Sequence, residues 1–355
     1  MRATAERKNE GVLYVNGNVL KFGGTSLGDA TALIKAAAIV KGDENARAVV
    51  VSAPGKRHFS DKKITDLLYD VASSHGASPS LFDIKNRFDE MIMTLGVDLD
   101  FGDEYDMIAR AAKDGDTPLV VSRGEYLSAK ITAKYMGFDF IDAADVIRFD
   151  ARGALDKDAT FSLIRAAFGD KNRAVIPGFY GADENGNIAV FPRGGSDITG
   201  AVVSAALGAD YFNYTDVSGF MYIDPKYTDA PRPIESLSYG EAIFLASYGA
   251  GVLHADVARY ARDAGVKIHV KNTFSPSDAG TIIKDRSPHG ASVYGVSGVY
   301  GFFGDRSAVA VGCRGGDVAP AALGDDARLE KREECGAVFS VPNEKFERTM
   351  RALGE

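Results

Sequence analysis

The sequence predicts an α/β fold built around a mostly parallel sheet. From Val19 onward, short runs of β-branched residues alternate with longer helical stretches, and this alternation is typical of βαβ units. Hydrophobic residues make up 45% of the chain and charged residues 25%, as in ordinary globular proteins. The length of 355 residues suits one large domain with a smaller appendage.

The predicted elements follow one another along the chain in βαβ order. The expected strands are 20–22, 48–52, 119–122, 138–142, 174–176 and 211–215. Helices expected between and after them include 30–41, 64–74, 126–136, 197–207 and 239–247. The segment 79–115 has helical periodicity and no strand candidate, so we expect a helical insertion over one edge of the sheet.

The character of the sequence changes after Thr281. Two short β-like runs, 293–300 and 307–312, precede a glycine-rich loop at 312–326. A third run at 337–341 and a closing helix at 343–352 follow. We expect about one small βα unit, forming a separate and smaller layer.

Charge and composition exclude several classes of protein. The chain carries 41 basic and 49 acidic residues, a net charge of −8, and the basic residues are scattered, which argues against a nucleic-acid or anionic membrane surface. It has no run of 18 apolar residues, and residues 1–18 lack an apolar signal core, so we expect a cytoplasmic protein. Cys313 and Cys335 are interpreted as reduced and structural; a disulfide between them is the alternative.

The first segment that suggests chemistry is KFGGTS at 21–26, where a predicted strand ends and a helix begins. Gly23 and Gly24 would let backbone N–H groups turn toward an anion, and the helix N-terminus adds a favourable dipole. Lys21 could then neutralise phosphate charge, with Thr25 beside it. A plain tight turn with a surface lysine is the structural alternative, and a Gly-Gly pair alone would favour it.

A second glycine loop, RGGSD at 193–197, also precedes a predicted helix. Arg193 offers a forked guanidinium suited to a carboxylate, Gly194 a turn, Ser196 a hydroxyl and Asp197 a carboxylate at a helix start. Alternatively, Asp197 is only a helix cap and Arg193 a solvated charge. Two such loops in one chain favour a ligand site, because α/β sheets bind ligands at the carboxyl ends of their strands.

Three further segments are less specific. The stretch TDVSGFMYIDPK at 215–226 could line a nucleotide pocket through Thr215, Asp216, Tyr222 and Lys226, but taken alone it favours a β-hairpin with an Asp turn. The stretch SAPG at 52–55 contains Ser52, and Thr65 follows at a helix start. Glu125, after Gly124, is expected to open a helix and could hold an ammonium group. Thr65 could donate to a carboxylate, or both could be ordinary first-turn residues.

Read together and in this order, these segments resemble the aspartokinase branch of the amino-acid kinase family. The matching stretches are KFGGTS at 21–26, 51–55 with Thr65, Gly124-Glu125, 178–197 ending in RGGSD, TDVSGFMYIDP at 215–225 and GAGVLH at 249–254. The resemblance covers about residues 19–285. It implies a three-layer αβα sandwich whose N-lobe (about 19–180) binds the amino acid and whose C-lobe (about 181–285) binds ATP with Mg²⁺. Residues 1–18 would be an N-terminal extension.

The resemblance also implies roles for individual residues. The phosphates would be contacted by Lys21, Gly23, Gly24 and Thr25. Aspartate would be bound by Ser52, Thr65, Glu125, Arg193, Gly194 and Ser196, with Glu125 on the ammonium and Arg193 on a carboxylate. Asp197 would orient Lys21. The nucleotide pocket would be formed by Thr215, Asp216, Tyr222, Lys226, Gly251 and Val252.

The implied activity is that of an aspartate kinase, which moves the ATP γ-phosphoryl group to the β-carboxylate of L-aspartate on the way to lysine, threonine and methionine. The acceptor carboxylate is already ionised at neutral pH, so the reaction needs positioning and charge neutralisation but no dedicated base. The expected partners are L-aspartate and ATP, with magnesium reaching the site on the ATP phosphates and without dedicated protein ligands. We also expect a homodimer.

The chain departs from the family at two places. Gly251 stands where relatives often have a lysine, and Lys226 is expected to supply the missing charge. Relatives usually carry two ACT regulatory domains, whereas the residues 286–355 have room for about one reduced ACT-like region, which leaves control by lysine or threonine open. Two alternatives also stay open: a kinase for another amino acid or an aspartate analogue, and a non-catalytic regulatory subunit.

Overall fold

The structure is a computed structural model, and it describes residues 17–169, 173–192, 194–286, 293–313 and 323–354. An eight-stranded sheet forms its centre, and all neighbouring strands in it are parallel except the antiparallel pair β9 and β10. In spatial order the strands are β3 (Asp139–Phe140), β4 (Ala174–Pro177), β2 (Ala46–Val51), β1 (Asn18–Phe22), β7 (Asp210–Thr215), β9 (Ile268–Asn272), β10 (Thr281–Lys284) and β8 (Ser236–Ser238). This confirms the predicted mostly parallel sheet.

Helices cover both faces of the sheet, as expected for a three-layer sandwich. Successive residues of the central strands alternate between two apolar cores: Val19 and Val50 face one, and Leu20 and Val49 face the other. The first core includes α7 (Lys157–Phe168), α8 (Gly195–Leu207), α9 (Tyr239–Ser247) and α10 (Ala255–Ala264). The second includes α1 (Ala30–Gly42), α2 (Ile64–Ser73) and α5 (Thr117–Met136).

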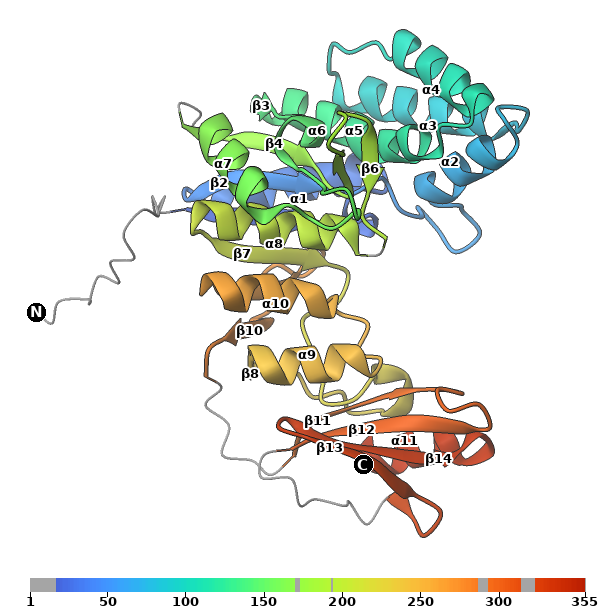
Figure 1. Cartoon of the computed structure of the whole chain (residues 1–355), viewed down its shortest axis with the longest axis vertical. Coiled ribbons are helices and arrows are strands. Elements are labelled where there is room, and N and C mark those ends of the chain that lie inside the picture. Colours follow the sequence, from blue (N-terminus) through green and yellow to red (C-terminus); the bar gives the residue numbers. More distant parts are fainter. Residues whose placement is uncertain (1–16, 170–172, 193, 287–292, 314–322, 355) are drawn as a thin grey trace, which may run out of the picture.

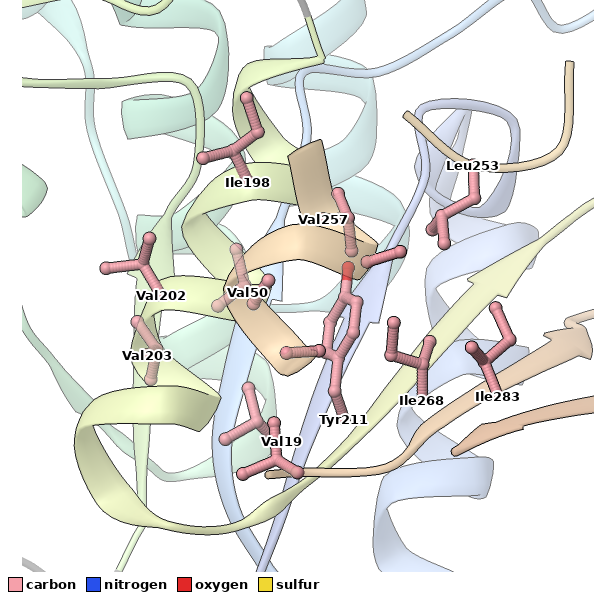
Figure 2. Packing of buried hydrophobic residues seen from close by; sticks show 14 of the residues in the cluster. Val19, Val50, Ile198, Val202, Val203, Tyr211, Leu253, Val257, Ile268 and Ile283 are labelled. Carbon is pink, nitrogen blue, oxygen red and sulfur yellow. The ribbon is translucent and has the colours of Figure 1, made fainter. Parts of the chain in front are cut away.

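Tyr211 on β7 lies at the centre of the first core (Figure 2). Its side chain is fully buried, and its ring packs against Gly200 of α8, where an added Cβ would lie 2.5 Å from Cε2 of the ring. The hydroxyl donates a hydrogen bond of 3.2 Å to the backbone carbonyl of Asp197. This packing holds the first turn of α8 beside the central strands.

The predicted strand 119–122 is wrong, because these residues lie inside helix α5. The helix starts at Asp116, whose side chain accepts a hydrogen bond from the N–H of Leu119 at 3.1 Å, and Pro118 occupies its first turn. Val120 and Val121 are buried in the second core. A short apolar run does not distinguish a buried strand from a buried helix, and here tertiary packing decides.

The predicted hairpin in the segment 214–226 is also wrong. After β7 the chain forms turns, a one-turn helix at Pro225–Tyr227 and a single bridge between Met221 and Pro233. The other predicted strands are present, although only Asp139–Phe140 of the segment 138–142 pairs as a strand. Elements before residue 286 that were not among the predictions include the hairpin β5 (Tyr180–Ala182) and β6 (Ile188–Val190), helices α6 (Ala143–Val146), α7 and α10, and strands β8, β9 and β10.

The predicted insertion is helical and consists of α3 (Ser80–Leu95) and α4 (Gly102–Asp114). Its apolar faces pack on α1, α2 and α5 in the second core, so it extends a helical layer instead of covering a sheet edge. In Figure 1 the insertion and the C-terminal sheet lie at opposite ends of the molecule.

The C-terminal region forms a four-stranded antiparallel sheet in the order β11 (Val293–Val299), β12 (Arg306–Cys313), β14 (Gly336–Pro342) and β13 (Arg328–Glu333). One face packs on α11 (Phe346–Gly354) and the other on α9. Strand β13 escaped prediction because its sequence, RLEKRE, is charged and exposed. Cys313 and Cys335 are not joined by a disulfide. Among the described residues, no helix combines the length and apolarity needed to cross a bilayer.

Candidate active site

The two glycine loops meet at an ion pair between a buried lysine and a half-buried aspartate. Lys21 lies near the end of β1 with 6% of its surface exposed, and Asp197 lies in the first turn of α8. The Nζ of Lys21 is 2.5 Å from Oδ1 of Asp197. The loop KFGGTS and residues 194–197 of the second loop therefore lie at the same edge of the sheet, although Lys21 and Asp197 are 176 positions apart in the sequence. The sequence hypothesis requires this arrangement.

Asn213 is a member of this junction that sequence reasoning missed. It lies opposite Lys21 in the pairing of β1 with β7 and is 1% exposed. Its Oδ1 accepts from Nζ of Lys21 at 3.5 Å, and its Nδ2 donates to Oδ1 of Asp197 at 3.5 Å. The signal for it was an amide side chain in the otherwise apolar and aromatic run YFNY.

The loop after β1 is held by direct backbone contacts. The N–H of Gly23 donates to the carbonyl of Tyr214 at 3.0 Å, and the N–H of Gly55 donates to the carbonyl of Gly24 at 2.8 Å. An added Cβ at Gly55 would lie 2.7 Å from the backbone carbon of Gly24, so this approach requires glycine. Thr25 is exposed and begins a one-turn helix that ends at Leu27.

Ser26 faces away from this exposed edge. Its hydroxyl is buried and shares a hydrogen bond of 2.7 Å with the hydroxyl of Thr273, which follows β9. Ser26 therefore fastens the loop to the sheet, whereas Thr25 is the loop hydroxyl that a ligand can reach.

Glu125 lies in the middle of α5, not at a helix start as predicted, and is 5% exposed. Burial raises the pKa of its carboxyl to about 8, although a hydrogen bond from the backbone of Ala53 and the charge of Lys21 both favour the ionised form. Its Oε2 is buried without a hydrogen-bond partner. Gly124 permits this placement, because an added Cβ there would lie 2.8 Å from Cβ of Ala53. A buried acceptor oxygen that lacks a donor suits a cationic group.

The other residues predicted to bind the amino acid lie on the loops around this point. The N–H of Ser52, after β2, donates to the carbonyl of Phe22 at 3.2 Å, and Thr65 lies half-buried in the first turn of α2. Gly194 has a φ of +61° and packs against His254, which explains the glycine. Ser196 packs against Gly178. Arg193 lies outside the described residues.

A cavity of about 260 Å³ lies where the nucleotide segment was predicted. Six residues were predicted to contact the nucleotide alone. Four of them line this cavity: Thr215, Asp216, Gly251 and Val252. The remaining lining comes from Val217, Gly219, Phe220, Met221, Asp224, Pro225, Tyr227, Gly249, Ala250, Val296, Ser297, Gly298 and Met350.

Tyr222 and Lys226 are not among the residues that line this cavity. The carbonyl of Tyr222 accepts from the N–H of Val296 at 2.6 Å, and its ring packs at the C-terminal core with Arg232 above it at 4.3 Å. The Nζ of Lys226 pairs with Oδ2 of Asp224 at 3.0 Å. These two side chains therefore lie outside this cavity, and their contact with the nucleotide stays a prediction.

Part of the cavity wall comes from the C-terminal region, which the sequence did not suggest. Val296, Ser297 and Gly298 of β11 and Met350 of α11 all line it. The hydroxyl of Ser297 donates to the carbonyl of Leu245 on α9 at 3.2 Å, which fixes β11 against the large domain. The smaller sheet is thus a separate layer, as expected, but it also packs against the candidate nucleotide cavity.

Comparisons with known proteins agree with this arrangement. The family model described as Amino acid kinase family matches residues 16–272. Aspartokinase 3 of Bacillus subtilis is 31% identical over 305 residues, which cover 80% of this chain and 67% of that protein. An aspartokinase of Bacillus sp. (strain MGA3) is 31% identical over 75% of this chain and 58% of its own length. The chain thus spans about three fifths to two thirds of these relatives.

Solved structures give the same result. The structure of Clostridium acetobutylicum aspartate kinase has a TM-score of 0.82 and 28% identity, and covers 96% of this chain and 99% of that chain. E. coli aspartokinase III, solved in complex with aspartate and ADP, has a TM-score of 0.83 and covers 95% of this chain and 98% of that chain; at 21% identity it supports the fold alone. Since the family model matches more than half of the residues, this chain belongs to the amino acid kinase family.

Proposed function

We propose that this chain is an ATP-dependent aspartate kinase, which transfers the γ-phosphoryl group to the β-carboxylate of L-aspartate and forms 4-phospho-L-aspartate, the first step towards lysine, threonine and methionine. The observation that carries the proposal is the junction at which Lys21 of one glycine loop contacts Asp197 of the other at 2.5 Å. An anionic acceptor and an anionic phosphate can react only where positive charge and backbone donors converge on both.

The amino acid would bind on the α5 side of the junction. The unpartnered Oε2 of Glu125 is a suitable acceptor for the substrate ammonium, and that ion pair would offset the cost of ionising a buried carboxyl. Thr65 and Ser52 present hydroxyl groups from neighbouring loops. Arg193, assigned on the family resemblance, would bind a carboxylate in a forked geometry. Gly194 and Ser196 belong to the same loop.

Phosphoryl transfer would then depend on charge placement. Lys21 would neutralise phosphate oxygens, and Asp197 together with Asn213 would hold its ammonium group in place. Gly23, Gly24 and Thr25 would approach the phosphates through the loop backbone. The attacking carboxylate of aspartate, with an ordinary pKa near ~4, needs no general base at neutral pH. Each well-placed charge contributes roughly 10² to 10³ in rate.

ATP would occupy the cavity lined by Thr215, Asp216, Gly251 and Val252. Magnesium would be held mainly by the ATP phosphates and would neutralise charge on them. Within the described part of the chain, no group of three or more His, Cys, Asp or Glu side chains could hold a metal ion by itself. Asp216 and Asp224 are the acidic residues on the wall of this cavity.

We propose the same domain division as the sequence suggested. The catalytic domain would span 19–285, with an amino-acid lobe to about 180 and an ATP lobe from about 181, and the ACT-like region would span 286–355. A homodimer and a cytoplasmic location complete the proposal. Size-exclusion chromatography with light scattering tests the oligomeric state.

A hydroxamate assay tests the activity. The purified chain is incubated with ATP, magnesium and hydroxylamine, which traps acyl phosphates, together with one of a panel of amino acids. The expected result is magnesium-dependent product with L-aspartate alone. Product with a different acid would identify a kinase of another pathway, and no product with any of them would favour a non-catalytic subunit.

A further inference from the structure

We infer that Arg87, on helix α3 of the insertion, is a positioning residue that clamps the loops of the active site together. This inference rests on the proposed function for its kinetic consequence, but its structural basis is independent of the reaction. It also assigns a role to the insertion, which contains none of the motifs that carry the family resemblance.

The guanidinium of Arg87 is buried, with 5% of the residue exposed, and it donates to three backbone carbonyls. Its Nη1 donates to Lys62 at 2.7 Å. Its Nη2 donates to Gly55 at 2.6 Å and to Gly28 at 3.1 Å. Carbonyl groups bonded to a charged donor at these distances are held more firmly than by neutral hydrogen bonds.

Each of the three carbonyls belongs to a different part of the candidate site. Gly28 lies in the loop between β1 and α1, and Gly55 lies near the start of the loop between β2 and α2. Lys62 precedes α2, whose first turn contains Thr65. The first two loops also bond to each other, because the N–H of Gly55 donates to the carbonyl of Gly24. One side chain from the insertion thus joins the phosphate loop to both amino-acid segments.

Arginine suits this task because its donors project in a fixed planar fork, so carbonyls from different loops can be bound at once. A lysine ammonium presents its donors from one atom and cannot span the same three positions. The nearest carboxylate, Oδ2 of Asp61, is 3.7 Å from Nη1 and is itself bonded by Nε of Arg57 at 2.8 Å. An apolar side chain could fill the same space without the cost of burying a charge. The specific contribution of the guanidinium is therefore to hold the three carbonyls in fixed positions.

The expected kinetic consequence is specific. Without the clamp, the loops occupy the binding-competent arrangement for a smaller fraction of the time, and the apparent affinity for substrates falls by that fraction. Once both substrates are bound, the loops are ordered again and the chemical step proceeds. A clamp therefore affects KM far more than kcat.

The test compares Arg87→Met with Lys85→Met, a matched control on the same helix. Lys85 is exposed and pairs with Asp89 at 3.1 Å, one turn along the helix. We expect Arg87→Met to raise KM for aspartate and ATP about 10- to 100-fold, with kcat within about 3-fold of wild type. Hydrogen exchange of the ligand-free protein should accelerate in peptides covering 24–31 and 53–64 and stay unchanged in β7. Lys85→Met should match wild type in both measurements.

Arg87→Lys provides the second variant, and it keeps the charge if Arg87→Met does not fold. We expect intermediate KM values and intermediate loop exchange, because one ammonium satisfies fewer of the carbonyls. A folded variant with the KM values and the loop hydrogen exchange of wild type would overturn the inference. Hydrogen exchange that accelerates uniformly across the whole protein would also overturn it, because it would indicate a merely structural role. Hydrogen exchange is measured without catalytic turnover. If the wild-type protein is inactive on aspartate, the proposed function is refuted, and the exchange measurements still test the clamp.

Discussion

Replacing Glu125 with glutamine should make the stability of the protein less dependent on pH. Burial raises the pKa of this carboxyl from its ordinary value of 4.5 to about 8. The unfolded chain releases the proton above 4.5, whereas the folded protein keeps it until about 8. The folded state therefore binds the extra proton in this window, and stability falls as the pH rises through it.

The size of the effect follows from that window. Each pH unit within it costs about 1.4 kcal/mol, so the wild-type protein loses roughly 3 kcal/mol between pH 5 and pH 8 through this group. Glutamine has nearly the same shape and does not ionise. The stability of Glu125→Gln minus that of wild type should therefore increase by roughly 3 kcal/mol over the same range.

Urea unfolding followed by circular dichroism at pH 5, 6.5 and 8 measures this difference. Glu104→Gln is the control for loss of a negative charge, because Glu104 lies nearer the surface and pairs with Lys130 at 2.9 Å. Parallel pH profiles for Glu125→Gln and wild type would refute the reasoning, since they would mean that the buried carboxyl ionises as it does in the unfolded chain.

The raised pKa of the Glu125 carboxyl also predicts that aspartate binding releases a proton. An ammonium beside Oε2 favours the ionised carboxylate, so aspartate binding at pH 7 should release up to one proton. Isothermal titration calorimetry in buffers of different ionisation enthalpy counts released protons directly. Glu125→Gln should bind aspartate more weakly and release none, and equal proton release by both proteins would assign the proton to another group.

Three further substitutions test other parts of the structure. Asp197→Ala should lower kcat by at least ~10² with an unchanged circular dichroism spectrum, because Lys21 loses the carboxylate that holds it, and near-normal kcat would reject that role. Gly251→Lys should lower KM for ATP several-fold, since a Cβ there meets open space and the side chain adds a cation at the cavity; an unchanged KM would show that the charge does not reach the phosphates. Gly200→Ala should lower the free energy of unfolding by about 1–3 kcal/mol, measured with urea, because its Cβ would lie 2.5 Å from the buried ring of Tyr211, and a neutral effect would contradict that packing.

Features that depend on local sequence were predictable. The strand that carries Lys21 is a short, mostly apolar run that ends before Gly23, and helix α8 begins at the glycine pair of RGGSD and ends before Gly208, so their positions were expected correctly. The glycine loops could also be recognised from their residue types, because a binding loop at a strand end is formed by a few residues in a fixed local order. Glu125 was selected as a site residue, but its surroundings were assigned wrongly, because a valine-rich run before it reads equally well as a strand.

The sequence by itself determined the class of fold, the two glycine loops and the residue types proposed for the reaction, because each is encoded within a few neighbouring residues. Only the tertiary structure decided that Asn213 joins the Lys21–Asp197 pair, that Arg87 ties the β1–α1 loop to both ends of the β2–α2 loop, and that β11 forms part of the candidate nucleotide cavity. These contacts join residues separated by tens to more than a hundred positions. Their geometry arises only when the apolar cores on both faces of the sheet bring the strands and helices into register.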